Sequence, residues 1–198
     1  MNTRALLGCC AAAAGIVWGV AACSSPERLA SPDSRQVRSL LDAPDPNQLV
    51  APVNRQAPLA SDVSWSFTAG PLGATSSNSA VGLTVSVPAG ALATTQTITV
   101  TALAGSAVAY RFEPHLQFAH PVTLTQDLSA TSAAGTLGGA LLSGAHFSGD
   151  ALELTSDGLA SVTELVPATV NLLTSTAHFD VAHFSGWIVA SGKDGGGQ

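Results

Sequence analysis

From residue 61 onward, apolar and polar residues alternate along most of the chain. The pattern is clear at Val81, Leu83, Val85 and Val87, and turn residues such as Gly90 separate the alternating segments. A period of two places successive side chains on opposite faces of a strand. No long segment has a convincing helical period. Many short strands favour a β-sandwich or barrel, and we expect an all-β fold with a single antiparallel β-sandwich over residues 61–190.

The first 22 residues have the layout of an export signal. Arg4 and the free amine are positive, and a short apolar run follows before Cys23. The run is short for a membrane span, which needs roughly 20 apolar residues. Val20-Ala21-Ala22-Cys23 resembles the bacterial lipobox, which implies cleavage before Cys23, diacylglycerol on its thiol and acylation of the new amine. A plain secretory signal or an uncleaved anchor is the alternative interpretation.

This resemblance predicts a lipoprotein of the bacterial cell envelope. Ser24 follows the lipidated cysteine, and the absence of Asp there favours the outer membrane where a cell has one. Cys9 and Cys10 leave with the signal, so the mature chain has no internal disulfide. The membrane is thus the expected partner, reached through lipid on Cys23.

Residues 23–60 are expected to form the lipidated N-terminus and a flexible tether. This segment has no aromatic residue, its basic and acidic residues cancel, and it contains six prolines: Pro26, Pro32, Pro44, Pro46, Pro52 and Pro58. At the other end, residues 191–198 are expected to be a disordered, glycine-rich tail.

The charge distribution excludes one class of partner. The whole chain has 7 basic and 13 acidic residues, and residues 61–190 contain Arg111 as their one basic residue. A nucleic-acid-binding domain needs a basic surface, so no nucleic-acid partner is expected. An acidic domain does not by itself define another partner.

Two stretches, residues 83–100 and 110–124, resemble the ZU-five family, the β-rich module named for zonula occludens and netrin-receptor proteins and also found in ankyrins. The first carries the strand that enters Pro88-Ala89-Gly90-Ala91, and the second carries a Phe-x-Pro segment that leads to Phe-x-x-Pro-Val. The segment 182–187 is similar to the family's C-terminal end. The resemblance covers about residues 66–190, with a looser match over 126–178, and it implies a β-rich scaffold.

In some members of that family a His-Phe-Ser segment cleaves itself before the serine. The resemblance makes His183 the candidate base and Ser185 the candidate nucleophile for a cut between Phe184 and Ser185. The reaction needs a nearby base, a strained peptide and a donor to the developing oxyanion. Residues two apart leave one face of a strand, which allows proximity. No third group that would orient His183 is visible in the sequence, so we expect a closing structural strand and no enzyme activity.

Histidines invite a metal hypothesis that their spacing does not favour. His115 and His120 are five residues apart, as are His178 and His183, so each pair would point to opposite faces of a straight strand. No HExxH or paired CxxC occurs. We therefore expect no metal and no cofactor. The segment 145–149 repeats Ala-His-Phe-Ser-Gly of 182–186, which we interpret as coincidence or a weak structural echo.

These observations favour a membrane-anchored envelope lipoprotein that presents a non-enzymatic β-sandwich as an interaction or structural module, with an envelope or surface protein as partner. Two alternatives stay open: the self-cleaving module, and an envelope carbohydrate- or peptide-binding protein with Trp187 near a groove. Trp65 and Trp187 are otherwise expected in the core.

Overall fold

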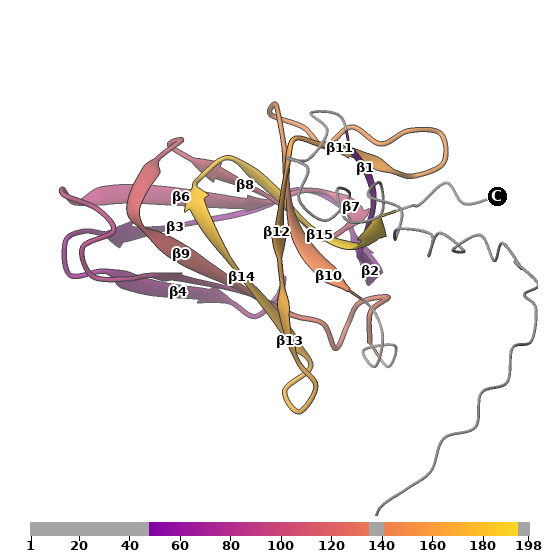
Figure 1. Ribbon diagram of the computed structural model, residues 1–198, viewed down its shortest axis with the longest axis horizontal. Helices are drawn as coiled ribbons and strands as arrows, with labels where there is room; N and C mark the ends of the chain where they lie inside the picture. Colours follow the sequence, from indigo (N-terminus) through magenta and orange to yellow (C-terminus); the bar gives the residue numbers. More distant parts are fainter. Residues whose placement is uncertain (1–47, 135–140, 194–198) are drawn as a thin grey trace, which may run out of the picture. The chain divides into compact units, whose positions relative to one another are not determined.

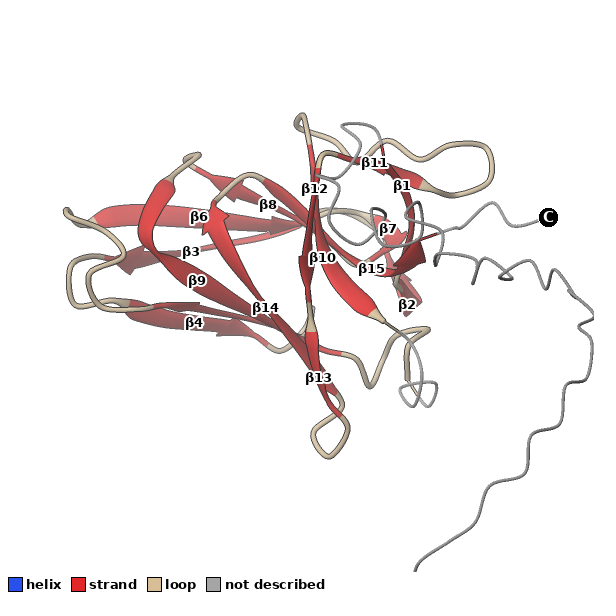
Figure 2. Ribbon diagram, in the orientation of Figure 1, coloured by secondary structure: helices blue, strands red, loops and turns tan. Residues whose placement is uncertain are grey.

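The computed structural model describes residues 48–134 and 141–193 (Figure 1). The expected signal peptide 1–22, the lipid site Cys23 and the tether up to residue 47 lie outside these residues. All regular elements of the described part are β-strands, as expected from the alternating pattern (Figure 2). No helix in this part of the chain is long and apolar enough to cross a bilayer.

The described residues form fifteen strands, and every pairing between them is antiparallel. The largest sheet has eight strands: β1 (Gln48–Pro52), β3 (Val63–Ala69), β6 (Gln96–Ala102), β8 (Ala109–Glu113), β10 (Leu142–Phe147), β11 (Ala160–Val162), β12 (Glu164–Pro167) and β15 (Gly186–Lys193). A second sheet has five: β4 (Ala74–Asn78), β5 (Leu83–Val87), β9 (Gln117–Asp127), β13 (Thr169–Asn171) and β14 (Thr176–His183). The short strands β2 (Asn54–Leu59) and β7 (Gly105–Ala107) pair with each other.

Strand β15 has three partners in the eight-stranded sheet. It pairs with β10 from Gly186 to Ser191 along one edge. Along the other edge its first residues pair with β8 and its last residues with β1. The C-terminal strand therefore holds together parts of the chain that are far apart in sequence.

The two larger sheets contribute side chains to one hydrophobic core. Val85 and Leu124 of the five-stranded sheet belong to the same buried cluster as Val100, Phe112 and Trp187 of the eight-stranded sheet, and each of these side chains is fully buried. Burying apolar surface between sheets is the main favourable term for such a fold. The expected core position is confirmed for Trp187, whereas Trp65 is only partly buried against this cluster.

The turn at Pro88-Ala89-Gly90 also matches the expectation. Strand β5 ends at Val87, directly before the proline, which lacks the donor that a ladder needs. Gly90 has a φ of +80°, a conformation that glycine adopts without steric cost.

The N-terminal boundary expected at residue 61 is wrong. Residues 48–59 form β1 and β2, and Val50 and Val53 are each 1% exposed. Strand β1 is paired with both β11 and β15. The structured region therefore reaches back at least to Gln48, and a flexible tether cannot extend to residue 60.

The prolines of this segment favoured a tether, but proline is tolerated at a β-bulge, and the pairing of β1 with β15 shifts register between Val50 and Ala51, next to Pro52. Arg55 is also fixed in place: its Nη1 donates to the carbonyl of Ala107, and its guanidinium lies 5.7 Å from the centre of the Tyr110 ring. At the other end β15 continues to Lys193, so residues 191–193 belong to the sheet and not to the expected tail.

Candidate functional site

The His183-Phe184-Ser185 segment, which was expected to be a closing structural strand with self-cleavage as the alternative, connects the two larger sheets. His183 is the last residue of β14, Phe184 and Ser185 form the connection, and Gly186 begins β15. The ring of Phe184 stacks on Phe112 with 4.4 Å between ring centres and meets the edge of Phe118 at 4.6 Å. Phe184, the residue before the candidate cut, is therefore held firmly in the core.

The backbone on both sides of this bond is also fixed. The amide of Phe184 donates to the carbonyl of Leu116 at 2.8 Å, and the amide of Phe112 donates to the carbonyl of Ser185 at 2.9 Å. Among the described residues, Ser175 is the only non-glycine residue with a positive φ. The backbone of Phe184 and of Ser185 is therefore not left-handed. The junction is ordered, and its φ angles give no sign of strain.

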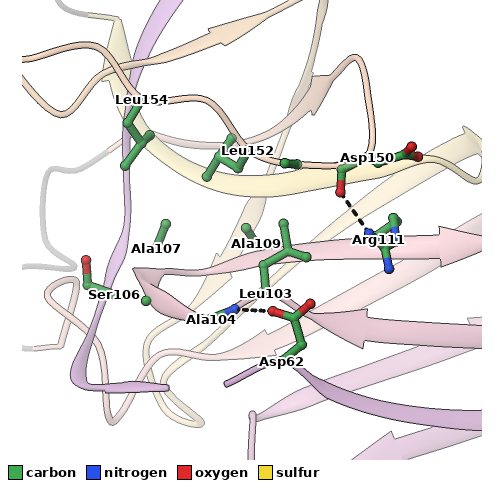
Figure 3. Close-up of a pocket in the computed structure, with 12 residues that line it drawn as sticks. Asp62, Leu103, Ala104, Ser106, Ala107, Ala109, Arg111, Asp150, Leu152 and Leu154 are labelled. Atoms are coloured by element: carbon green, nitrogen blue, oxygen red, sulfur yellow. Dashed lines mark hydrogen bonds between the residues drawn. The ribbon is translucent and has the colours of Figure 1, made fainter. Parts of the chain in front are cut away.

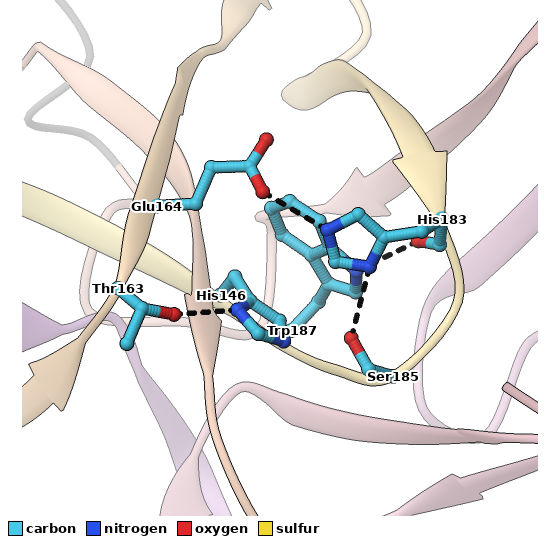
Figure 4. A network of polar contacts seen from close by, with 6 residues as sticks. All are labelled: His146, Thr163, Glu164, His183, Ser185 and Trp187. Carbon is cyan, nitrogen blue, oxygen red and sulfur yellow. Dashed lines mark hydrogen bonds and ion pairs between the residues drawn. The ribbon is translucent and has the colours of Figure 1, made fainter. Parts of the chain in front are cut away.

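Ser185, His183 and Glu164 form a continuous polar chain (Figure 4). Ser185 Oγ lies 3.2 Å from His183 Nδ1, and His183 Nε2 lies 2.9 Å from Glu164 Oε2. The His183 side chain is 20% exposed and that of Glu164 is 38% exposed. The expectation that His183 has no orienting group is wrong, because Glu164 occupies that position. Nucleophile, base and orienting carboxylate in this order are the arrangement that activates serine in hydrolytic enzymes.

Strand register explains why Glu164 lies there. His146 of β10 is opposite Glu164 of β12 on one side and opposite Trp187 of β15 on the other. His183, at the end of β14, reaches the same place because the chain crosses from one sheet to the other directly after it. Both imidazoles lie against the indole of Trp187, with ring centres 5.5 Å away for His146 and 5.4 Å for His183.

We call His146, Glu164 and His183 the histidine cluster. One potential ligand atom from each residue lies within 4.8 Å of the other two, and all three residues are of intermediate burial. The two imidazole rings meet edge to face at 4.9 Å. Thr163 Oγ1 lies 2.6 Å from Nδ1 of His146 and fixes that ring from outside the cluster.

The surroundings of His146 favour its uncharged form, compared with a histidine in water. Burial lowers its pKa below the ordinary value, because the charged imidazolium loses hydration. The neighbouring His183 and His115 lower the pKa further, and Glu164 opposes them. The net direction is downward, so the ring is a neutral nitrogen donor at neutral pH.

The repeated Ala-His-Phe-Ser-Gly segments are neighbours in the fold. Phe147 of the first copy is opposite Gly186 of the second, and a Cβ at Gly186 would lie 2.5 Å from the Phe147 ring. His146 and His183 thus come from the two copies of the repeat and lie next to each other, whereas the metal hypothesis from the sequence concerned only the pairs five residues apart. The repeat, interpreted as coincidence or a weak structural echo, was the one sequence feature that linked these two histidines.

A separate pocket of about 490 Å³ lies beside β7 and β8 (Figure 3). Its lining shares no residue with the histidine cluster and includes no aromatic side chain. Arg111 Nη1 donates to the carbonyl of Asp150 at 2.8 Å, and Asp62 Oδ1 accepts from the amide of Ala104 at 2.8 Å. The carbohydrate- or peptide-binding alternative placed Trp187 near a groove, but this side chain is fully buried, as the core expectation predicted.

Comparison with protein-family models and with curated proteins found no match to this chain. The resemblance to the ZU-five family therefore stays a prediction that rests on residues 83–100, 110–124 and 182–187. The geometry around Ser185 stands on this chain alone.

Proposed function

We propose that this chain is a lipid-anchored envelope module with a β-sandwich fold that cleaves its own backbone once, between Phe184 and Ser185. The single observation that carries the proposal is the Ser185–His183–Glu164 chain, with separations of 3.2 Å and 2.9 Å. The sandwich assignment is supported by the core that the two larger sheets share. The envelope location is supported by the lipobox-like residues before Cys23.

The proposed reaction needs no reagent except water. His183 Nδ1 takes the hydroxyl proton of Ser185, and Oγ attacks the carbonyl carbon of Phe184. The C–N bond then breaks, the Ser185 amine takes a proton, and an ester joins Phe184 to the Ser185 side chain. Water hydrolyses this ester to a Phe184 carboxylate and a free Ser185. Glu164 accepts a hydrogen bond from Nε2 of His183 and thereby leaves the lone pair at Nδ1, which a base requires.

A substrate within the chain suits this site better than a separate molecule. The scissile bond adjoins the nucleophile, so no separate substrate has to be bound and oriented. The pocket beside β7 and β8 contains none of these three residues. A non-enzymatic interaction module is the outcome if no cut occurs. Ligand binding in that pocket is a second candidate, supported by its volume and testable on a glycan array.

The cut is tested by incubating the purified protein at neutral pH for days. Samples are denatured at intervals and their intact masses are measured. We expect a fragment that runs from Ser185 to the C-terminus, and hydroxylamine should speed its release by trapping the ester. Ser185→Ala should abolish the fragment, whereas Ser148→Ala, the same change in the first repeat, should leave it unchanged. His183→Ala should slow cleavage roughly 10²- to 10⁴-fold, the usual contribution of a general base.

Glu164→Gln tests the orienting carboxylate. The amide is similar in shape but offers no negative charge, so cleavage should slow, while Glu153→Gln at an exposed position should have no effect. A protein that stays at full mature mass with hydroxylamine present would refute the proposal and leave the interaction module.

A further inference from the structure

Three strands bring metal-ligating atoms to one place. His146 comes from β10, Glu164 from β12 and His183 from β14, and one ligand atom of each lies within 4.8 Å of the others. Figure 4 shows the Glu164 carboxylate and both imidazoles gathered around the Trp187 side chain. None of the three residues is adjacent to another in sequence, so only the fold assembles the group.

The donor set is one that catalytic zinc sites use. Imidazole nitrogens and carboxylate oxygens both bind zinc. Two imidazoles and one carboxylate fill three of the four positions around the ion, and water takes the fourth. A tetrahedral zinc with bonds of about 2.0–2.2 Å holds its ligand atoms roughly 3.3–3.6 Å apart. The observed separations run from 2.9 Å between His183 and Glu164 to within 4.8 Å overall, so shifts of about 1 Å suffice.

Supporting contacts around the cluster are those of a metal site. Metal-binding histidines commonly use their second ring nitrogen in a hydrogen bond that fixes tautomer and ring orientation. Thr163 lies at hydrogen-bond distance from Nδ1 of His146, at 2.6 Å, and restrains that ring. Ser185 does the same at Nδ1 of His183, at 3.2 Å. The Trp187 indole packs against both rings and limits their rotation.

We propose that His146, Glu164 and His183 bind a divalent transition metal ion, with zinc as the best match, and that bound metal prevents the self-cleavage proposed above. The inhibition rests on the proposed self-cleavage, whereas the metal site does not depend on it.

The inhibition follows from the tautomer of His183. Without metal, Nε2 carries the proton that Glu164 accepts, and Nδ1 has the lone pair that removes the hydroxyl proton of Ser185. Metal at Nε2 displaces that proton, so the neutral ring carries its proton at Nδ1. A ring in this state donates to Ser185 Oγ and cannot act as its base.

Zinc binding is tested on the unmodified chain, because Ser185→Ala would remove a hydrogen bond that supports His183. Calorimetric titration with zinc chloride should show one ion per chain. His146→Ala and Glu164→Gln should each weaken binding more than about tenfold, while His178→Ala, a change outside the cluster, should leave it unchanged. Circular dichroism checks that each variant is folded, and Glu164→Gln decides the matter if His146→Ala unfolds. The absence of binding at one ion per chain, or binding that neither cluster variant weakens, would overturn the metal site.

Regulation is tested on the unmodified chain. Saturating zinc should slow release of the C-terminal fragment by roughly the 10²- to 10⁴-fold that a general base contributes, and a chelator should restore the rate. If zinc binds and the rate of cleavage does not change, the proposed inhibition is overturned. No cleavage in chelator would refute the proposed function, and the regulatory half with it, while the titration still decides the metal site.

Discussion

At the residue scale, the buried tyrosine shows how burial and hydrogen bonding set a side chain's chemistry. The Tyr110 hydroxyl lies 2.6 Å from Gln126 Oε1 and 2.9 Å from the carbonyl of Val81, and its one proton donates to one of them at a time. Burial raises the pKa of Tyr110 to about 12, because the phenolate would lose its hydration. The charge of Arg55 opposes this effect but does not cancel it.

This shift predicts a loss of stability at alkaline pH. Between about pH 10 and pH 12 the unfolded chain loses the phenol proton while the folded chain keeps it, so the free energy of unfolding is full below that range and falls across it, by up to about 3 kcal/mol. Urea unfolding at a series of pH values measures the loss, and Tyr110→Phe should flatten it. Tyr110 is the one tyrosine of the chain, so tyrosinate absorbance reports its ionisation directly. Ionisation near pH 10 in the folded protein would contradict this account.

At the element scale, β1 shows how a strand hides in a proline-rich segment. Val50 is 1% exposed and packs with β11 and β15, whereas its neighbour Leu49 is 41% exposed. Opposite faces of one strand thus lie in the core and in solvent. The alternation extends over only a few residues, which is too short to stand out among the prolines of the sequence.

Two aspartate variants test whether residues 48–52 are a strand or a tether. Val50→Asp should lower the free energy of unfolding by at least about 3 kcal/mol, because it buries an unpaired charge. Leu49→Asp should cost less than about 1 kcal/mol, since that side chain faces solvent. Denaturant unfolding of both variants measures the difference. If both variants lower the free energy of unfolding equally and only slightly, residues 48–52 are a flexible tether and not a strand.

At the scale of the whole molecule, lipid on Cys23 would tie the β-domain to a membrane. One acyl chain binds membranes only marginally, and several anchor stably. Cys23→Ala should abolish labelling by a fatty-acid analogue and leave an unprocessed precursor. Cys10→Ala, the same change inside the apolar run, should keep both labelling and processing. Labelling that persists in Cys23→Ala would remove the anchor from the proposal.

The proposed cut has a consequence at this scale because β15 pairs with β1, β8 and β10. Cleavage before Ser185 would leave β15 joined to the domain by backbone hydrogen bonds and by the buried Trp187. The cut chain would therefore stay assembled under native conditions, and the fragment would separate only on denaturation.

Local patterning in the sequence was enough to determine several strands of the two larger sheets and the faces of those strands, but it missed β1 and β2. Val85, Val100 and Leu124 are buried as their alternation predicted, because a period of two assigns each side chain to a face without reference to the partner strand. The turn after Val87 followed in the same way, since proline and glycine act on their own backbone.

Tertiary structure alone decided what surrounds His183. Alternation says which face a residue occupies but not which strand lies beside it, so the sequence could not place Glu164 at 2.9 Å from His183 Nε2. The register of β10 against β12 and β15, and the crossing of the chain between sheets at Phe184, brought His146 and Glu164 to that point. Strand pairing is a long-range choice made by packing of the whole core, and the chemistry at Ser185 depends on that choice.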